Sequence, residues 1–511
     1  MRESSFRRRV GGSYHPEPKQ LRLSRRQVLV AGGTGLAAAA LAACAGQTAP
    51  LLRPIGPRGP EVEAAERARA VAGATTASFK VNSGAVTVDL GGVTVDTWAY
   101  DGVIPGPLLT ADVGQILEVT VANGLPDPTT VHWHGLALRN DMDGVPGLTQ
   151  SPIAPRESMT YRFSLAHPGT YWFHPHVGTQ LDRGLYAPLI INDPSEPGAY
   201  DAEHVIVLDD WLDGTGETPD QVLDRLRSEG MDMGGMGGSP ASEELGGDAG
   251  DVVYPYYLVN GRIGTAPQAI DALPGQRLRL RLINAGGDTA FRVALGGHQL
   301  TVTHTDGFPV QPFTGDAVLI GMGERVDVLV TRGDGAFPLV SVAEGKDGAG
   351  LALIRTGDGA APGPDIRPAE LAGRVVTVRD LRAADDVLLA DRRPDRTHEL
   401  VLEGGMDGGY RWTINGRTFD RVEPLPVRAG ETVRLRFINR SMMFHPMHVH
   451  GHTFQVRNEQ GDGPRKDTVI VRPMETVVAD LVADNPGQWL THCHNIYHGE
   501  AGMMTTLSYV L

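Results

Sequence analysis

Cysteine is scarce in this chain of 511 residues, and its two cysteines, Cys44 and Cys493, are too few for a disulfide framework. Aromatic residues are also few, at 6%, and helical patterns are sparse, whereas glycine and proline number 65 and 36. This composition fits turn-rich all-β domains rather than helical bundles. The length exceeds what one ordinary hydrophobic core supports and suggests about three domains.

A long apolar run is also missing from the N-terminal region, where the uncharged stretch 27–43 is marginal for a membrane span. It follows Arg25 and Arg26, so residues 1–44 are predicted to be a twin-arginine-type export signal. The last four residues, Leu-Ala-Ala-Cys, resemble a lipobox in which Cys44 is lipidated after cleavage. An uncleaved membrane anchor is the alternative. Residues 45–75 are predicted to be a tether, which would hold the protein at the outer face of the cytoplasmic membrane.

The charge balance limits the partners. The net charge is −15, although the first 43 residues hold eight Arg and Lys against two Glu, so the remaining chain is more acidic than the total. An acidic body argues against nucleic acid and anionic membrane surfaces as partners. We therefore expect membrane contact only through a lipid anchor.

Histidine, by contrast, is concentrated in four pairs separated by one residue each: His132/His134, His174/His176, His448/His450 and His492/His494. In a β-strand residues i and i+2 point to the same face, so each pair presents two imidazoles side by side. Cys493 lies between the last two and faces the opposite way. One strand could therefore hold a metal on each side.

The surrounding residues indicate which metal. Beside these pairs lie His445, His498 and Met503. Imidazoles with one thiolate and a distant thioether form the ligand set of a blue copper site, and a lone thiol in an exported protein favours a ligand role for Cys493. Eight further imidazoles suit a copper cluster better than a structural zinc site. The alternative, satisfied core histidines, explains a lone histidine better than ten of the 17 in this pattern.

Three weakly similar repeats organise the chain. Residues 114–123, 275–284 and 430–439 each run from glycine to asparagine and alternate apolar and polar residues, as half-buried strands should. At the same offsets beyond the asparagine, the first and third copies carry the pairs beginning at His132 and His448. The middle copy carries Val293 and Leu295 instead.

The other two pairs recur in the same way, each six residues after a Pro-Gly dipeptide, and the middle copy again lacks histidine. We expect domains at 76–195, 196–365 and 366–511, with the histidine cluster between the first and third and the middle domain as a spacer. A short helix is predicted over 218–228, with Thr218 as its N-cap. His298 and His304 form no pair and are interpreted as core or surface residues.

Several motifs together resemble the multicopper oxidases, the laccase and cuprous-oxidase family: residues 132–135 (His-Trp-His-Gly), 143–146, 168–176, 445–452 and 492–498. The resemblance covers nearly the whole chain after the tether. Residues 139–144 and 209–211 are most similar to actinobacterial envelope oxidases linked to copper tolerance. The resemblance implies an all-β fold of three consecutive cupredoxin-like Greek-key β-sandwich or barrel domains, with no copper ligands in the middle one.

The resemblance also implies four copper ions and their ligands. The type 1 copper would take His445, Cys493, His498 and, as axial ligand, Met503. The type 2 copper would take His132 and His448, and the type 3 pair would take His134, His174 and His494 on one ion and His176, His450 and His492 on the other. Electrons would pass from Cys493 through His492 and His494 to the trinuclear cluster, where dioxygen is reduced to water.

Two acidic residues match family positions that serve proton transfer. Asp143 matches the acid beside the trinuclear cluster, although Asp-Gly is also a common turn pair. Glu500 matches an acidic position of some laccases, and an exposed surface acid is its alternative. We predict that both assist oxygen reduction.

The substrate is the least determined feature. Met231, Met233 and Met236 lie in a glycine-rich loop and could bind Cu(I), because soft thioethers favour it; a linker with incidental methionines is the alternative. We expect a monomeric cuprous oxidase that uses dioxygen, with a laccase-type phenol oxidase as the second candidate. A copper-storage protein or a relative that has lost its metals would not need both the full histidine set and Cys493.

Overall fold

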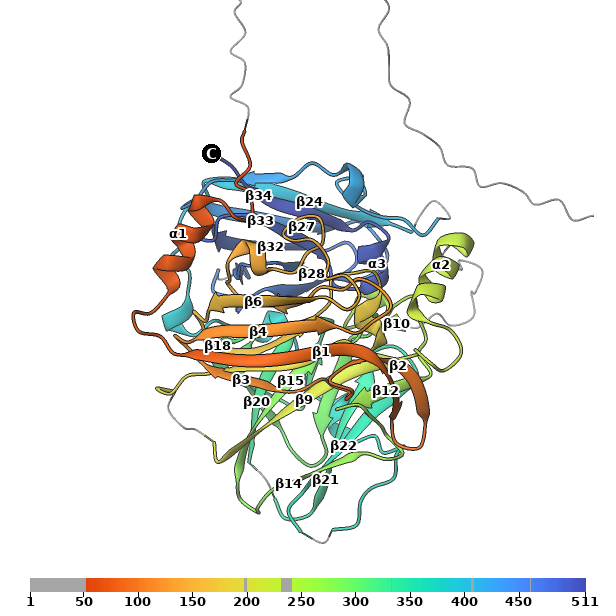
Figure 1. Ribbon diagram of the computed structural model, residues 1–511. Coiled ribbons are helices and arrows are strands. Elements are labelled where there is room, and N and C mark those ends of the chain that lie inside the picture. The colour runs from red at the N-terminus through yellow and green to blue at the C-terminus, as the bar shows by residue number, and fades with distance from the viewer. Residues whose placement is uncertain are drawn as a thin grey trace, which may run out of the picture. The chain divides into compact units, whose positions relative to one another are not determined.

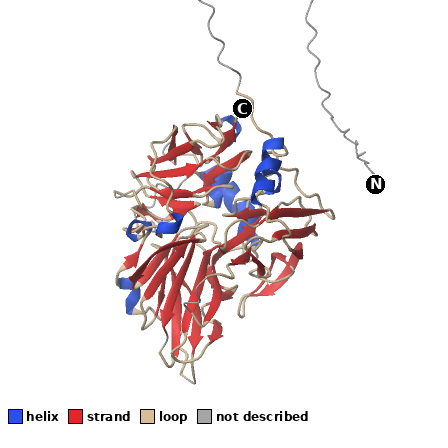
Figure 2. Cartoon of the chain, turned by 90° about the vertical axis from the view of Figure 1, so that its left-hand side faces the viewer, coloured by secondary structure: helices blue, strands red, loops and turns tan. Residues whose placement is uncertain are grey.

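Strands predominate throughout the described chain, and they form three groups that follow one another in the sequence (Figures 1 and 2). The computed structural model describes residues 52–196, 200–230, 241–331, 333–357, 359–405, 409–459 and 461–511. The predicted export signal with Cys44 and the three loop methionines Met231, Met233 and Met236 lie outside the described residues. Residues Leu52–Leu511 form one compact unit.

The first group forms two four-stranded sheets, in the orders β2-β1-β4-β6 and β3-β8-β7-β5. Side chains from both sheets meet in one core, with Val119 and Phe163 from the first and Trp133, Phe173 and Leu189 from the second. Strand β4 alternates partly buried and buried residues, as its sequence pattern predicted. The strands are β1 (Thr76–Asp89), β2 (Thr94–Tyr100), β3 (Leu109–Asp112), β4 (Ile116–Asn123), β5 (His132–His134), β6 (Ser158–Ser164), β7 (Gly169–His174) and β8 (Ala187–Asn192).

The middle group pairs a seven-stranded sheet, β13-β12-β9-β15-β20-β17-β18, with a six-stranded sheet, β14-β22-β21-β16-β19-β23. Its repeat strand β15 is buried almost throughout, unlike β4, because Arg279 and Arg281 pair with the buried Asp327. The strands are β9 (Ala202–Trp211), β10 (Ala241–Ser242), β11 (Gly247–Asp248), β12 (Tyr256–Val259), β13 (Arg262–Ile263), β14 (Gln268–Asp271), β15 (Arg277–Asn284), β16 (Phe291–Leu295), β17 (Leu300–Thr305), β18 (Phe308–Gly315), β19 (Ala317–Ile320), β20 (Arg325–Thr331), β21 (Ala336–Ala343), β22 (Ala349–Arg355) and β23 (Val375–Val376).

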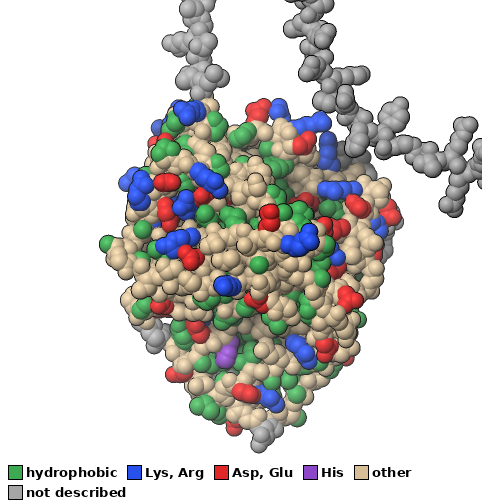
Figure 3. Space-filling view, viewed as in Figure 1, with side chains coloured by type: hydrophobic (Ala, Val, Ile, Leu, Met, Phe, Trp, Pro, Cys, Tyr) green, Lys and Arg blue, Asp and Glu red, His purple; other side chains and the backbone are tan. Residues whose placement is uncertain are grey.

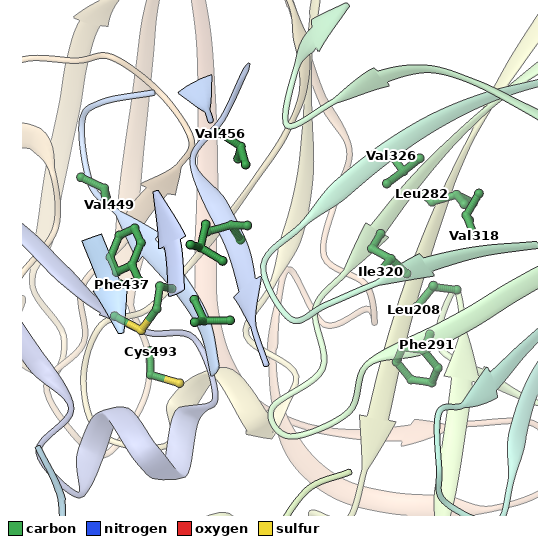
Figure 4. Close-up of a cluster of buried hydrophobic side chains, with 14 of the residues drawn as sticks. Leu208, Leu282, Phe291, Val318, Ile320, Val326, Phe437, Val449, Val456 and Cys493 are labelled. Carbon is green, nitrogen blue, oxygen red and sulfur yellow. The ribbon is translucent and has the colours of Figure 1, made fainter. Parts of the chain in front are cut away.

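The third group has a six-stranded sheet, β25-β24-β27-β32-β29-β30, and a five-stranded sheet, β26-β34-β33-β28-β31. Its strands are β24 (Arg396–Gly404), β25 (Trp412–Ile414), β26 (Leu425–Val427), β27 (Thr432–Asn439), β28 (His445–Val449), β29 (Phe454–Val456), β30 (Arg465–Lys466), β31 (Thr468–Val471), β32 (Thr476–Val482), β33 (Gln488–Cys493) and β34 (Met504–Tyr509). Buried side chains of the middle and third groups belong to one connected cluster, and Figure 4 shows its two parts, around Ile320 and Phe291 and around Phe437 and Cys493.

Helices are short and few among the described residues. Helix α2 (Pro219–Glu229) begins after Thr218, whose hydroxyl accepts a hydrogen bond from the Gln221 amide, so the predicted helix and its N-cap are confirmed. Helix α3 (Ile496–Glu500) follows the last histidine pair. The 3-10 turns are η1 (Asn140–Met142), η2 (Gln180–Arg183), η3 (Ala369–Ala372), η4 (Val378–Asp380), η5 (Asp385–Val387) and η6 (Phe419–Arg421).

The described part of the predicted tether, residues 52–75, is folded rather than extended. It contains helix α1 (Pro60–Arg69), whose Val62 is fully buried, and the amide of Ile55 donates to the carbonyl of Tyr509 near the C-terminus. The composition was misleading here because one valine on an otherwise polar helix gives little hydrophobic periodicity. The prediction of a tether is therefore wrong over these residues.

The segment between the middle and third groups packs against the middle one. Strand β23 runs parallel to β19, and Ala383 forms a bridge with Val310. The predicted boundary at residue 366 assigns this segment to the third domain, although its backbone hydrogen bonds join it to the middle sheets.

The surface of the described unit carries charges of both signs. Figure 3 shows acidic and basic side chains interspersed over one face, so the acidic excess is not collected into one patch there. Among the described residues, none of the helices has the length and hydropathy that crossing a membrane requires.

Candidate metal centres

Strand alternation places the histidines on one face and apolar residues on the other. Trp133, between His132 and His134, is fully buried in the first core and contacts Tyr161 and Phe163. Val449 and Cys493 are likewise buried in the core of the third group. Because these central residues point into the cores, the flanking imidazoles must point the opposite way.

Strand pairing then brings the pairs together in each domain. In the first group β5 lies antiparallel to β7, with His132 opposite His174. In the third group β28 lies antiparallel to β33, with His448 opposite His492. The two strand pairs face one another: His132 stacks on His450, with ring centroids 3.7 Å apart, and His134 stacks on His448 at 3.8 Å. All eight imidazoles therefore gather between the first and third domains.

The potential ligand atoms of the described residues fall into five groups, each with its atoms within 4.8 Å of one another; one joins Asp143 to His132 and His450, and the other four contain only histidine and cysteine. Of these four, two consist of the histidines expected around the type 3 ions, a third joins the two expected type 2 ligands with His134, and the fourth is the set expected for type 1. These four groups are His134/His174/His494, His176/His450/His492, His132/His134/His448 and His445/Cys493/His498.

Hydrogen bonds fix which ring nitrogen of each histidine is free. The Nδ1 atoms of His132, His174 and His492 each lie 2.9 Å from a backbone carbonyl oxygen, which only a protonated nitrogen satisfies. The Nε2 atom of each therefore carries a lone pair. Such contacts are the usual outer support of metal-bound histidines, because they set the tautomer and the ring orientation.

The lone pairs have no partner in the protein. Within the histidine cluster, the buried ring nitrogens without a hydrogen bond are Nε2 of His132, His174, His176 and His448, Nδ1 of His134 and both nitrogens of His494. His450 and His492 direct their Nε2 atoms at one another across 3.1 Å, although both rings donate through Nδ1 elsewhere. Buried unpaired acceptors are costly, and a cluster of them fits soft or borderline cations such as copper.

Electrostatics keep these rings neutral. Burial and the neighbouring imidazoles lower the pKa of His174, His176 and His450 well below the ordinary histidine value. The same causes lower the pKa of His492 and His494. Because only the neutral ring can donate a lone pair, the cluster is held in its metal-binding form.

The second centre lies on the opposite face of β33. The Sγ atom of Cys493 lies 3.6 Å from Nδ1 of His445 and 3.6 Å from Nδ1 of His498, and these two nitrogens are 3.1 Å apart. Their Nε2 atoms are engaged by Ser441 Oγ at 2.8 Å and Asp251 Oδ2 at 2.9 Å. Both Nδ1 atoms and the sulfur thus converge on one point.

The predicted axial residue is placed beside this centre by the backbone. Met503 is fully buried, its amide donates to the carbonyl of His498, and its carbonyl accepts the amide of Cys493. Trp412 covers the same centre, with its ring centroid 4.1 Å from that of His498. Burial raises the pKa of the Cys493 thiol, so a bound cation is required to hold a thiolate there.

Asp143 joins the two halves of the histidine cluster. Its carboxylate accepts from Nδ1 of His450 at 3.0 Å and lies 3.2 Å from Nδ1 of His132. It is fully buried at the end of turn η1, and Gly144 follows with φ +85°, where an added Cβ would lie 2.0 Å from the carbonyl oxygen of Val131. The turn interpretation of Asp143-Gly144 is correct, and the turn aims the carboxylate at the histidines.

Glu500 lies where the cluster opens outward. It lines an open cavity of about 500 Å³ that reaches His176, and also a narrow one of about 20 Å³. The narrow cavity is bounded by His174, His492 and His494 as well. Burial raises the pKa of Glu500 above the ordinary value. It is a partly buried acid on the approach to the cluster rather than a surface acid.

Sequence reasoning missed several supporting residues. Asp467 lies 3.1 Å from Nε2 of His134, and Asp251 bonds His498, across 333 and 247 residues of chain respectively. No local pattern marks either aspartate, because the contacts exist only after the domains have packed. His298 and His304 are partly buried and fall in none of the groups found among the described residues.

Comparison with known proteins shows the family to which the chain belongs. Multicopper oxidase family models match residues 81–196, 202–358 and 391–510. The chain is 51% identical over 499 residues to multicopper oxidase MmcO of Mycobacterium tuberculosis, with 96% of this chain and 97% of the relative covered. It is 28% identical to copper resistance protein A of Escherichia coli, with coverage of 83% and 91%.

Laccases are also similar. Laccase-2 of Botryotinia fuckeliana is 28% identical, with 83% and 80% coverage. The crystal structure of a laccase from Botrytis aclada has a TM-score of 0.71 at 26% identity, covering 86% of this chain and 88% of that one. Three family models, a relative at 51% identity and imidazole and thiol groups that fit copper show that the chain belongs to the multicopper oxidases, a family of cupredoxin-domain oxidoreductases with four copper ions as cofactor.

Proposed function

We propose that this oxidase removes single electrons from Cu(I) at the Cys493 centre and reduces dioxygen to water at the histidine cluster, as part of copper tolerance. Support for the copper-tolerance role comes from relatives named copper resistance protein A. In this proposal His445, Cys493, His498 and Met503 hold type 1 copper. His132 and His448 hold type 2 copper, and the remaining six cluster histidines hold the type 3 pair.

The observation that carries the choice of Cu(I) is the carboxylate at the outer nitrogen of His498. Asp251 Oδ2 lies 2.9 Å from Nε2 of this ring, on the side away from Cys493. A carboxylate there attracts a cationic electron donor and bonds the ring through which its electron enters. A neutral phenol carries no positive charge and could only hydrogen-bond to this carboxylate.

Further groups of suitable chemistry lie next to Asp251. Strand β11 forms a bridge from Asp248 to Met443, and the adjacent Met442 is 63% exposed. A carboxylate and an accessible thioether favour a soft cation such as Cu(I). The loop of Met231, Met233 and Met236 precedes this segment in sequence, and we include it in the proposed substrate site on its composition alone.

At the oxygen end the protein supplies acids and an approach. Bound copper supplies the one-electron steps. Glu500, whose pKa is raised by burial, can hold a proton at the mouth of the narrow cavity. Asp143 orients His132 and His450 from the first and third domains and offers a carboxylate beside them. We assign Glu500 to proton delivery and Asp143 to orientation and proton transfer.

A phenol oxidase is the second candidate, and the laccase-named relatives favour it. We also propose that the chain is exported by its twin-arginine-type signal, is anchored through lipidated Cys44 and acts as a monomer. The export and anchoring proposals depend on the sequence motifs.

Steady-state oxygen consumption with Cu(I) and with a phenol tests the substrate. The variants Asp248→Asn and Met442→Leu should raise the KM for Cu(I) and leave the phenol reaction unchanged, because neither residue supports the electron path. Asp224→Asn, at an exposed position of α2, is the matched control for loss of one surface charge. Equal effects on both substrates, or none on Cu(I), would contradict a cuprous site at this surface.

A further inference from the structure

The middle domain touches the histidine cluster directly, although its repeat lacks histidine pairs. The turn between β19 and β20 places Gly323 against two rings. A Cβ on Gly323 would lie 2.8 Å from Cδ2 of His494 and 3.0 Å from Cε1 of His134. The prediction that the middle domain is only a spacer is therefore incomplete, because its backbone forms part of the wall around the cluster.

Arg325 follows in the same segment and is fully buried. Its two terminal nitrogens donate to both carboxylate oxygens of Asp467, at 2.8 and 2.6 Å. Its Nε donates to the carbonyl of Thr170 in the first domain, at 3.0 Å, and Nη1 also donates to the carbonyl of Gly323. One guanidinium thus joins all three domains through bonds that require its planar fork.

Asp467, held in place by Arg325, is in turn hydrogen-bonded to two of the cluster histidines. Its Oδ1 lies 3.1 Å from Nε2 of His134 and accepts the hydroxyl of Thr468 at 2.8 Å. Its backbone carbonyl lies 2.9 Å from Nδ1 of His448. These bonds orient one ring from the first domain and one from the third, and the two rings stack at 3.8 Å.

A second carboxylate, that of Asp306 in the middle domain, holds the backbone around Asp467 in the third domain. Asp306 accepts the amides of Asp467 and Thr468, each at 3.2 Å, and the amide of Arg325 at 2.9 Å. Lys466 bonds the same carboxylate at 3.0 Å and Glu324 at 3.2 Å. The Asp467 side chain therefore has little freedom to turn away from His134.

We propose that Arg325 is a positioning residue for the trinuclear copper site: it holds Asp467, whose carboxylate bonds His134 and whose backbone carbonyl bonds His448, and so directs Nδ1 of His134 and Nε2 of His448 toward the metal. This inference rests on the ligand roles proposed above for these two histidines. It assigns the middle domain a function in building the cluster, beyond separating the other two.

The test compares Arg325→Lys and Arg325→Gln with a matched pair of variants at Arg279. Arg279 is equally buried, belongs to the neighbouring strand of the same sheet and grips buried Asp327 with two nitrogens, at 3.0 and 2.6 Å. The full-length enzyme is loaded with copper, and total copper, blue absorption and the type 2 electron paramagnetic resonance signal are measured.

We expect both Arg325 variants to keep the blue absorption but to show an altered type 2 signal and weaker copper retention in the cluster. Losing an outer support of this kind lowers metal affinity by about 10- to 100-fold. Lysine should not rescue the signal, since it keeps the charge without the fork. The Arg279 variants should keep both signals, even if their melting temperature falls equally.

A double-variant cycle makes the test independent of folding. If Arg325 acts through Asp467, Arg325→Gln added to Asp467→Asn should weaken copper retention little further. Additive losses, an unchanged type 2 signal in Arg325→Gln, or the same spectral change in Arg279→Gln would overturn the proposal. A wild-type protein without a type 2 signal would instead refute the ligand roles on which it depends.

Discussion

Removal of copper from the histidine cluster should lower the stability of the protein more than removal of copper from the Cys493 centre. Without metal, seven buried ring nitrogens of the cluster have no hydrogen-bond partner among the described residues. Each unpaired buried acceptor costs about 1–3 kcal/mol. One of the two His494 nitrogens carries the ring proton and cannot bind copper, so six acceptors correspond to roughly 6–18 kcal/mol, with the lower end expected because water can enter the narrow cavity.

The Cys493 centre provides the internal comparison. The outer nitrogens of His445 and His498 are bonded to Ser441 and Asp251 whether or not metal is present. Removing this copper therefore exposes fewer unpaired groups. For domains of this size a change of 1 kcal/mol shifts the melting temperature by about 2–4 °C.

Scanning calorimetry of the copper-loaded enzyme, the fully chelated protein and the variant Cys493→Ser measures these differences. We expect the chelated protein to melt at least about 10 °C below the loaded enzyme, and Cys493→Ser to lie much closer to the loaded form. If chelation shifts melting by less than about 2 °C, or if Cys493→Ser shifts it as far as chelation does, the reasoning from unpaired nitrogens fails.

Other predictions concern colour, pH and oxygen chemistry. Cys493→Ser should abolish the blue absorption and nearly all oxidase activity while the cluster keeps its copper, because serine supplies no soft thiolate; a blue, active variant would refute the type 1 assignment. Burial raises the pKa of Asp248 to about 6, so the KM for Cu(I) should fall as pH rises through this value, and Asp248→Asn should remove that step. The metal-free protein should lose stability as pH falls below about 6.5, the ordinary pKa of histidine. Rings such as His174 have a lowered pKa in the folded protein and stay neutral there, whereas the unfolded chain binds the protons. Urea unfolding at several pH values measures how the free energy of unfolding changes with pH. Glu500→Gln should slow oxygen reduction by about 10²- to 10⁴-fold without changing the blue absorption of the resting enzyme, and a normal rate would exclude it from proton delivery.

The sequence by itself determined that the ligand segments form β-strands and to which side of each strand the ligand side chains point. Alternation forces His132 and His134 to one side of β5 and Trp133 to the other, and the same rule separates Cys493 from its flanking histidines. The repeat spacing also indicated that the first and third domains share the cluster. These features were readable because they depend on residues adjacent in the chain.

Only the tertiary structure decided how the rings are supported. Arg325 and Asp467 are 142 residues apart, and His498 meets Asp251 across 247. No sequence pattern near Arg325, Asp467 or Asp251 indicates that it supports a ligand. A buried charge is stable wherever folding supplies its partner, and that partner can lie anywhere in the sequence. The role of the middle domain was hidden for the same reason. Its contribution to the histidine cluster is a backbone turn, one guanidinium and the Asp306 carboxylate, and these groups meet the ligands only once the three domains have packed together.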